Sequence, residues 1–279
     1  MSISPSVCII IPTYNQSVFI QKAVESALLQ DYRNLEVVVA DDNSNDATKA
    51  ILQPYIDQQK IRYYSSKSNL GRVANYQCAL QQYTTANWVI NLDGDDFFTN
   101  ASFVTKAIES IQDAGIDDVI FFQGVNIFQN KKKSTTIYPR IKEDEMVISG
   151  TAYFNGYFSR NSFSHMATLY NRQAAITSGF YEHDVLSSDV YSILQLCLTH
   201  PQKKAIVSKL VSGVWLQHEG NSSKSLKLQQ HFKNFFVLSG LFIQSIKKGL
   251  GFFTSILWFL KLCIFYLRLY TSLLKRKFV

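Results

Sequence analysis

The N-terminal half of the chain alternates short apolar runs with longer stretches in which apolar residues recur at helical spacing. The apolar runs predict buried strands at 7–11, 35–40, 61–64, 88–92 and 119–123. The helical spacing predicts helices over 17–30, 46–56, 72–82 and 101–114. Because strands that alternate with helices are typical of a parallel, doubly wound sheet, we predict an α/β fold.

The C-terminal half has a less regular pattern. We expect a hairpin around residues 129–134, where the KKK run is predicted to be a solvated loop tip. Residues 150–176 are rich in aromatic side chains and serine, and 179–198 are expected to be a loop that leads into a helix. With 279 residues, 47% of them hydrophobic, the chain can form one large α/β domain with an appendage.

Cysteine spacing and the N-terminal residues favour a cytoplasmic protein. Cys8, Cys78, Cys197 and Cys263 show neither CxxC nor CxH spacing, so we expect no disulfide framework and no structural zinc. The first residues, MSISPSVCIII, lack a basic segment followed by an apolar region and a small-residue cleavage site, so no secretory signal is expected.

Polar clusters follow four of the predicted strands. The sequence PTYN comes after the first strand, DDNSND after the second, SNLG after the third and DGDD after the fourth. In doubly wound sheets, ligands bind beyond the carboxyl ends of the strands. The clusters therefore predict one binding site at this edge, although Asn, Asp, Ser and Gly are also ordinary turn formers.

The acidic cluster INLDGDDF, residues 90–97, has two interpretations. Asp95 or Asp96 could cap the turn before the helix near Ala101. Alternatively, Asp93, Asp95 and Asp96 could bind a divalent cation, because Mg²⁺ and Mn²⁺ prefer a few carboxylates together with phosphate oxygens.

A cation bound by carboxylates and a diphosphate implies a nucleotide-activated substrate. The chain contains neither a GxxxxGK[ST] loop nor a GxGxxG turn, which argues against a P-loop phosphotransferase and a dinucleotide enzyme. Asp41 and Asp42 could accept hydrogen bonds from a base edge or a sugar hydroxyl, and Tyr14 could stack on the base.

Four segments together resemble the family 2 inverting glycosyltransferases, which have the GT-A fold. They are VCIIIPTYNQSVFIQKAVESALLQDYRNLEVVVADDNSNDAT, NLGRVANYQCAL, INLDGDDF and GFYEHDVLSSDVYSILQL. The resemblance is close over about the first 110 residues and looser to about residue 223. It implies a Rossmann-like, mostly parallel sheet flanked by helices, a nucleotide-sugar donor and a Mn²⁺ or Mg²⁺ cofactor.

The resemblance also assigns roles to individual residues. It implies nucleotide-sugar binding by Pro12, Tyr14, Asp42, Asn69, Gly71 and Asp93, and metal binding by Asp95. The family often has an A-R-N triplet where this chain has Asn75, Tyr76 and Gln77, and Arg72 could replace the missing arginine.

The GFYEHDVLSSDV segment places Asp189 at the family's catalytic-base position. Ser188 stands where the family more often has Glu, and Asp184 and Glu182 are alternative bases. Asp189 could instead be a helix N-cap. His218, in VWLQHEGNSS, matches a histidine that reaches the metal or the diphosphate in many of these enzymes, but it could equally be a surface histidine.

The C-terminal segment is basic and aromatic. The net charge of the chain is +7, and residues 222–279 contain ten Lys or Arg and no Asp or Glu. Polar residues recur every seven positions at Lys247, Thr254, Lys261, Arg268 and Lys275, which predicts a narrow stripe on an apolar helix. The helix could span a membrane, lie in its surface, or pack on the catalytic domain or a dimer partner.

These observations predict a catalytic domain, 1–225, and a membrane-associating tail, 226–279. Within the catalytic domain, 1–115 would bind the nucleotide and 116–225 the acceptor. We expect a peripheral enzyme on the inner face of the cell membrane, which transfers a sugar from a UDP-sugar to a glycan or lipid-linked glycan in surface polysaccharide synthesis, with no nucleic-acid partner. The rivals are a nucleotidyltransferase, which PTYNQS disfavours because it has neither Gly nor Lys, and a non-catalytic membrane scaffold.

Overall fold

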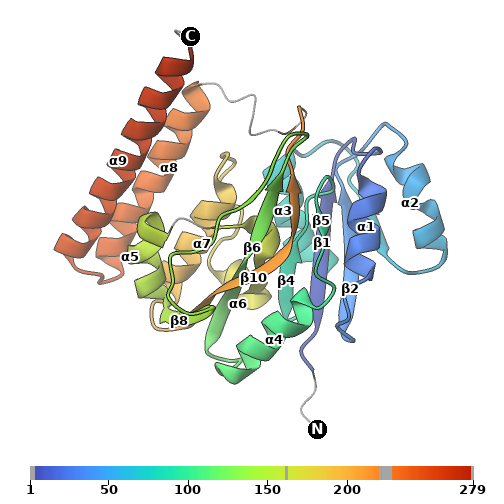
Figure 1. Ribbon diagram of the computed structural model, residues 1–279, viewed down its shortest axis with the longest axis horizontal. Helices are drawn as coiled ribbons and strands as arrows, with labels where there is room; N and C mark the ends of the chain where they lie inside the picture. Colours follow the sequence, from blue (N-terminus) through green and yellow to red (C-terminus); the bar gives the residue numbers. More distant parts are fainter. Residues whose placement is uncertain (1–3, 161–162, 220, 222–227, 278–279) are drawn as a thin grey trace.

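One mixed sheet runs through the centre of the computed structural model, which describes residues 4–160, 163–219, 221 and 228–277 (Figure 1). Its strands are β1 (Val7–Thr13), β2 (Leu35–Asp41), β3 (Arg62–Ser65), β4 (Trp88–Asn91), β5 (Phe97–Phe98), β6 (Val119–Gln129), β7 (Ser134–Thr136), β8 (Glu145–Ser149), β9 (Thr168–Asn171) and β10 (Lys204–Leu216). The strand order is β3-β2-β1-β4-β9-β6-β10-β5, with β7 beside β6 and β8 beside β10.

The parallel sheet that the sequence predicts is present in the N-terminal half. Strands β3, β2, β1 and β4 are parallel neighbours, whereas β9 is antiparallel to both β4 and β6. Strand β10 is parallel to β6 but antiparallel to β5 and β8. The sheet is therefore a parallel N-terminal half joined to a mixed second half.

Helices cover both faces of the sheet. They are α1 (Ile20–Leu28), α2 (Thr48–Asp57), α3 (Arg72–Cys78), α4 (Phe103–Asp113), α5 (Gly150–Arg160), α6 (Arg172–Thr177), α7 (Ser188–Thr199), α8 (Leu228–Lys247) and α9 (Phe252–Lys277), with a π-helix η1 (Ala79–Tyr83) and a 3₁₀ turn η2 (His165–Ala167). Ile9 and Ile11 of β1 pack in a core with α1, α2 and α4, whereas Cys8 and Ile10 face a second core that includes α3, α5, α7, α8 and α9. This alternation is the expected result of a strand buried on both faces.

Most of the predicted elements of the N-terminal half are found, with shifted ends. Strand β1 continues through Pro12 to Thr13, and the helix predicted over 72–82 is an α-helix that changes to a π-helix at Ala79. The hairpin around 129–134 is formed by β6 and β7, and Lys131 to Lys133 are exposed at its tip. The long strand β10 was not predicted; its pairing with β6 shifts register at several points, so it lacks a simple two-residue period.

The C-terminal segment forms a pair of helices, α8 and α9, at one end of the molecule beyond α5 and α7 (Figure 1). Trp258 of α9 is buried and stacks on Phe154 of α5 with ring centroids 4.5 Å apart. Packing on the catalytic core, one of the three alternatives for this segment, is therefore observed. Residues 226, 227, 278 and 279 of the predicted tail lie outside the described residues.

Candidate functional site

A cavity of about 620 Å³ lies beyond the carboxyl ends of the parallel strands. Its walls contain the predicted site residues Pro12, Tyr14, Asp42, Asn69, Gly71, Asp93, Asp95 and Asp189. Arg72 and Asp96 also line it, whereas Glu182 and Asp184, the alternative bases, are exposed and lie outside its walls. The structure thus brings together residues from five separate segments of the sequence.

The loop after β3 is held by Asp42. The Asp42 carboxylate accepts hydrogen bonds from the backbone N–H groups of Leu70 (2.6 Å) and Gly71 (2.9 Å). Gly71 has φ +87°, a conformation that favours glycine, and it directly precedes α3. Asp42 therefore shapes the predicted nucleotide loop through both carboxylate oxygens.

The neighbouring carboxylate, Asp41, has different hydrogen-bond partners from Asp42. Its carboxylate accepts hydrogen bonds from the backbone and hydroxyl of Ser44 and from the Tyr63 hydroxyl, and the residue is buried outside the walls of the cavity. Its hydrogen bonds fix the turn after β2, so Asp41 is not placed to meet a ligand in the cavity. Tyr14, in contrast, lines the cavity with 46% of its surface exposed and is accessible to a flat ligand.

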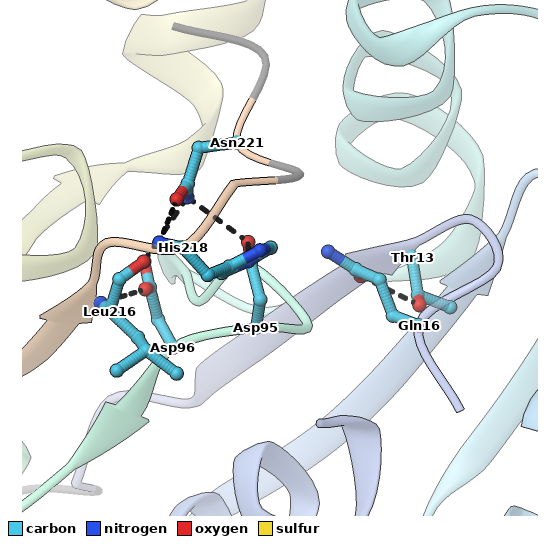
Figure 2. A network of polar contacts seen from close by, with 7 residues as sticks. All are labelled: Thr13, Gln16, Asp95, Asp96, Leu216, His218 and Asn221. Atoms are coloured by element: carbon cyan, nitrogen blue, oxygen red, sulfur yellow. Dashed lines mark hydrogen bonds and ion pairs between the residues drawn. The ribbon is translucent and has the colours of Figure 1, made fainter. Parts of the chain in front are cut away.

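The acidic turn between β4 and β5 brings three carboxylates together. One ligand atom each from Asp93, Asp95 and Asp96 lies within 4.8 Å of the others. A Cβ atom on Gly94 would lie 2.3 Å from Gln16 Oε1 and 3.0 Å from Thr13 Oγ1, so the turn packs closely against these two side chains. Thr13 and Gln16 hydrogen-bond each other at 2.8 Å beside the turn (Figure 2).

His218 reaches the acidic turn from the segment after β10. Its Nε2 lies 2.8 Å from Asp95 Oδ2 (Figure 2). Its ring stacks on Phe19 with centroids 4.6 Å apart. Asn221, which sequence reasoning missed, donates from Nδ2 to the same Asp95 oxygen at 3.3 Å. His218 is thus adjacent to the predicted metal ligand and is not an isolated surface histidine.

Burial and mutual repulsion change the acidity of this turn. Burial and the charge of Asp93 raise the pKa of Asp95, against the lowering effect of His218. Burial and the charges of Asp93 and Asp95 raise the pKa of Asp96 well above its ordinary value, although Asp96 accepts a hydrogen bond from Leu216 N–H at 2.8 Å. Neither residue caps the following helix, whose N-cap is Ser102, so the capping interpretation is wrong.

Asp93 has partners of its own. Burial alone would raise its pKa, but the nearby His165 imidazole, a hydrogen bond from Tyr76 and the charge of Arg72 lower it. The Tyr76 hydroxyl donates to Asp93 Oδ1, and His165 Nε2 lies 3.6 Å from the same oxygen. Tyr76 therefore contacts the acidic turn from the triplet position where the family often has arginine. The sequence around His165 contained no signal for this role, because the residue lies in an aromatic, serine-rich stretch without clear periodicity.

Asp189 is in the first turn of α7 and also lines the cavity. The N-cap of α7 is Ser187, so the interpretation of Asp189 as the N-cap is wrong. Asp189 Oδ1 accepts the backbone N–H of Val190 at 2.9 Å. The cavity is therefore lined by carboxylates from both the acidic turn and α7.

Comparison with known proteins identifies the fold. The TarS fragment of S. aureus in complex with UDP-GlcNAc superposes with a TM-score of 0.73 at 17% identity, over 91% of this chain and 70% of that one. A mannosyltransferase from Pyrobaculum calidifontis in complex with GDP-Man and Mn²⁺ superposes with a TM-score of 0.61 at 15% identity, over 97% of this chain and 76% of that one. The GT-A fold that the sequence predicts is therefore confirmed.

Sequence comparison identifies the family. A Campylobacter jejuni GalNAc(5)-diNAcBac-PP-undecaprenol beta-1,3-glucosyltransferase is 34% identical over 36% of this chain and 33% of its own length. The Escherichia coli chondroitin synthase is 29% identical over 82% of this chain and 32% of its own length. The chain thus spans about a third of the length of these relatives. The model of "Glycosyl transferase family 2" matches residues 8–178, and the chain belongs to this family.

Proposed function

We propose that the protein is a metal-dependent, inverting glycosyltransferase that moves a sugar from a nucleoside diphosphate, with UDP as the expected nucleotide, to a hydroxyl of a glycan or lipid-linked glycan. The observation that carries this proposal is the single cavity that joins the nucleotide loop, the acidic turn and Asp189. The similar structures with UDP-GlcNAc and GDP-Man support a nucleotide-sugar donor.

The residues of the acidic turn fit a divalent cation. Carboxylate oxygens suit Mn²⁺ or Mg²⁺, and His218 Nε2, a possible nitrogen ligand, lies 2.8 Å from Asp95 Oδ2. Asp95 and His218 would hold the ion, with Asp93 near the ion or the ribose. When bound, the ion would act as a Lewis acid that neutralises charge on the departing nucleoside diphosphate.

Asp189 is proposed as the catalytic base. An inverting transfer is a single displacement, in which the acceptor oxygen bonds to the anomeric carbon as the bond to the diphosphate breaks. A carboxylate must take the proton from that hydroxyl. Asp189 lies in the cavity wall, in the first turn of α7. The neighbouring Tyr157 and Phe163 would form part of the acceptor side of the cavity.

Nucleotide-sugar hydrolysis tests the enzyme and metal parts of this proposal. Purified protein should release the nucleoside diphosphate from one member of a panel of nucleotide-sugars when Mn²⁺ is present, and addition of EDTA should stop the reaction. The variant Asp95→Ala should lose the Mn²⁺-dependent reaction, because the ion loses a carboxylate ligand. Wild-type rates from Asp95→Ala, or equal rates with and without Mn²⁺, would contradict metal dependence.

We also propose that α8 and α9 dock the enzyme on the anionic inner surface of the cell membrane, where it would act in surface polysaccharide synthesis. Large apolar side chains remain exposed on α9, among them Phe253, Leu257, Ile264 and Leu267. Lys261 and Arg268 are exposed beside them. A helix with exposed apolar residues bordered by cations is typical of a membrane-surface helix. Residues 222–279 contain no acidic residue, which favours an anionic lipid surface over a protein partner of mixed charge.

Binding to lipid vesicles tests this surface. The double variant Leu257→Ser/Ile264→Ser should lower the affinity for vesicles that contain an anionic lipid by at least about tenfold, because less apolar area is buried. Leu29→Ser, which removes an equally exposed leucine at the end of α1, is the matched control. Unchanged vesicle binding in the double variant, or a dimer of the wild type that the double variant loses, would contradict membrane docking.

A further inference from the structure

The turn before α7 is held by residues from two other parts of the chain. The helix begins at Ser188, and its N-cap, Ser187, makes no side-chain capping hydrogen bond. Residues 184–187, which directly precede the first helical turn with Asp189, are bonded instead to side chains from other parts of the chain.

One of these contacts comes from the nucleotide-binding side. Arg72, the first residue of α3, donates from Nη2 to the backbone carbonyl oxygens of Val185 (3.2 Å) and Leu186 (2.9 Å). Its guanidinium also lies over the Tyr76 ring, 5.6 Å from the centroid. Arg72 thus connects the predicted nucleotide loop to the chain just before Asp189.

The other contacts come from α8, in the C-terminal helix pair. Lys233 Nζ donates to the backbone carbonyl oxygen of Asp184 at 2.7 Å. Asn234, which is only 2% exposed, accepts a hydrogen bond from Ser187 N–H at 3.3 Å and donates one to Ser187 Oγ at 3.3 Å. A buried amide is costly unless it is hydrogen-bonded, and both polar atoms of this side chain are used on one residue of the turn.

The apolar contact between α7 and α8 does not need Asn234. Leu238 and Leu241 of α8 are buried in the same core as Leu194 and Cys197 of α7. A separate hydrogen bond joins Gln244 to the Tyr191 hydroxyl at 3.0 Å. The hydrogen bonds of Lys233 and Asn234 to the turn are therefore separate from the contacts that pack α8 against α7.

We propose that Asn234 and Lys233 on α8, together with Arg72 on α3, are positioning residues that fix the turn 184–187 and thereby set the place of Asp189 in the active site. This inference rests on the proposed role of Asp189 as the base. Helix α8 would then affect the rate of transfer independently of any membrane contact, because Lys233 and Asn234 bind the turn that precedes Asp189.

Kinetics of the variant Asn234→Leu test this inference. A shift of about 1 Å in a reacting group can cost up to about a hundredfold in rate, so we expect kcat for transfer to fall by about tenfold or more. The Kd for UDP with Mn²⁺ and the binding to anionic vesicles should stay as in the wild type. Gln244→Leu, which removes a hydrogen bond between the same two helices away from the turn, should keep kcat within about twofold.

Arg72 is tested by Arg72→Lys, which keeps the charge but cannot bond both carbonyls in the same geometry. We expect a lower kcat with an unchanged Kd for UDP. A raised Kd for UDP with an unchanged kcat would assign Arg72 to the diphosphate and overturn its positioning role. If Asn234→Leu does not fold, Lys233→Met, at an exposed position, removes only the bond to Asp184 and should also lower kcat.

A double variant separates positioning from general stability. In an Asp189→Asn background, Asn234→Leu should cause no further loss of rate, because both changes act through the same group. A further loss of about tenfold would contradict the inference. If Asp189→Asn itself keeps full activity, the proposed base is wrong; if it is inactive while Asn234→Leu is normal, only the positioning inference is wrong.

Discussion

The nucleotide loop and the turn that carries the proposed base are held in different ways. Asp42 fixes Gly71 across 29 residues of sequence, within two adjacent βα units of the parallel sheet. The turn before Asp189 is fixed by Arg72, 114 residues from Leu186, and by Asn234, 47 residues from Ser187. The first arrangement is built into a local supersecondary unit, whereas the second exists only when α3, α7 and α8 are all in place.

This difference suggests that changes near the nucleotide loop affect donor binding, whereas changes near the base turn affect the rate of transfer. The following predictions test that separation, beginning with the largest expected effect.

Replacement of the proposed base should have the largest effect. Asp189→Asn keeps the size of the side chain and removes the proton acceptor, so transfer should fall by about 10²- to 10⁴-fold while the Kd for the donor changes little. Steady-state transfer assays and calorimetry with UDP measure the two quantities. Glu182→Gln, on an exposed carboxylate outside the cavity, is the control and should behave as the wild type. Full transfer by Asp189→Asn would place the base elsewhere.

Weakening of the proposed nucleotide loop should have an intermediate effect, which falls mainly on donor binding and less on the rate of transfer. Asp42→Asn leaves one acceptor oxygen for two N–H donors and removes the charge, and a hydrogen bond to a charged group is worth about 1.5 to 3 kcal/mol. We expect the Kd for UDP to rise by about tenfold or more, with a smaller change in kcat.

Asp41→Asn is the matched control for this variant. It changes the neighbouring carboxylate, which is also hydrogen-bonded but lies outside the cavity, and should lower thermal stability with little change in UDP affinity. Equal effects of the two substitutions on UDP affinity would mean that the loop after β3 has no special role.

The smallest expected effect is a dependence of stability on pH. The pKa values of Asp95 and Asp96 are raised above 3.8, so the folded chain binds these protons more tightly than the unfolded chain. The contribution of these two carboxyl groups to the free energy of unfolding is complete below pH 3.8. It is lost as the pH rises through their raised pKa values. Without metal, Tm should be about 2 to 4 °C higher near about pH 5 than near about pH 8, if about 1 kcal/mol is involved.

Asp96→Asn sharpens this measurement. It removes the carboxylate with the larger shift but keeps an acceptor for Leu216 N–H, so the difference in Tm between the two pH values should shrink. Mn²⁺ should raise Tm more at the higher pH, because the ion binds deprotonated ligands. The same pH profile in the variant and in the wild type would show that the acidic turn does not control it.

The sequence was sufficient to predict which residues of the N-terminal half line the cavity. Its strands are continuous apolar runs, and the residues that matter stand directly after them, so Asp42, Gly71 and Asp95 could be placed at one edge without coordinates. The prediction of Asp189 and His218 as site residues required the family resemblance, because the sequence around them gives no sign of which residues they contact.

The other contacts could not be predicted for a physical reason. Asn221, His165 and Asn234 are single polar residues in segments without a signal of their own, and their partners Asp95, Asp93 and Ser187 are distant in sequence. The packing of α8 and α9 on the core was only one of several outcomes, because an aromatic and basic helix is compatible with protein and with lipid contacts.

The pairing of β5 with β10 has a consequence for the order in which the active site is completed. Leu216 and His218, which contact Asp96 and Asp95, follow these residues by 120 and 123 positions. During synthesis from the N-terminus, the parallel strands can assemble while the acidic turn still lacks these contacts. The acidic turn can therefore gain its contacts with Leu216 and His218 only after β10 and the segment that follows it have been synthesised.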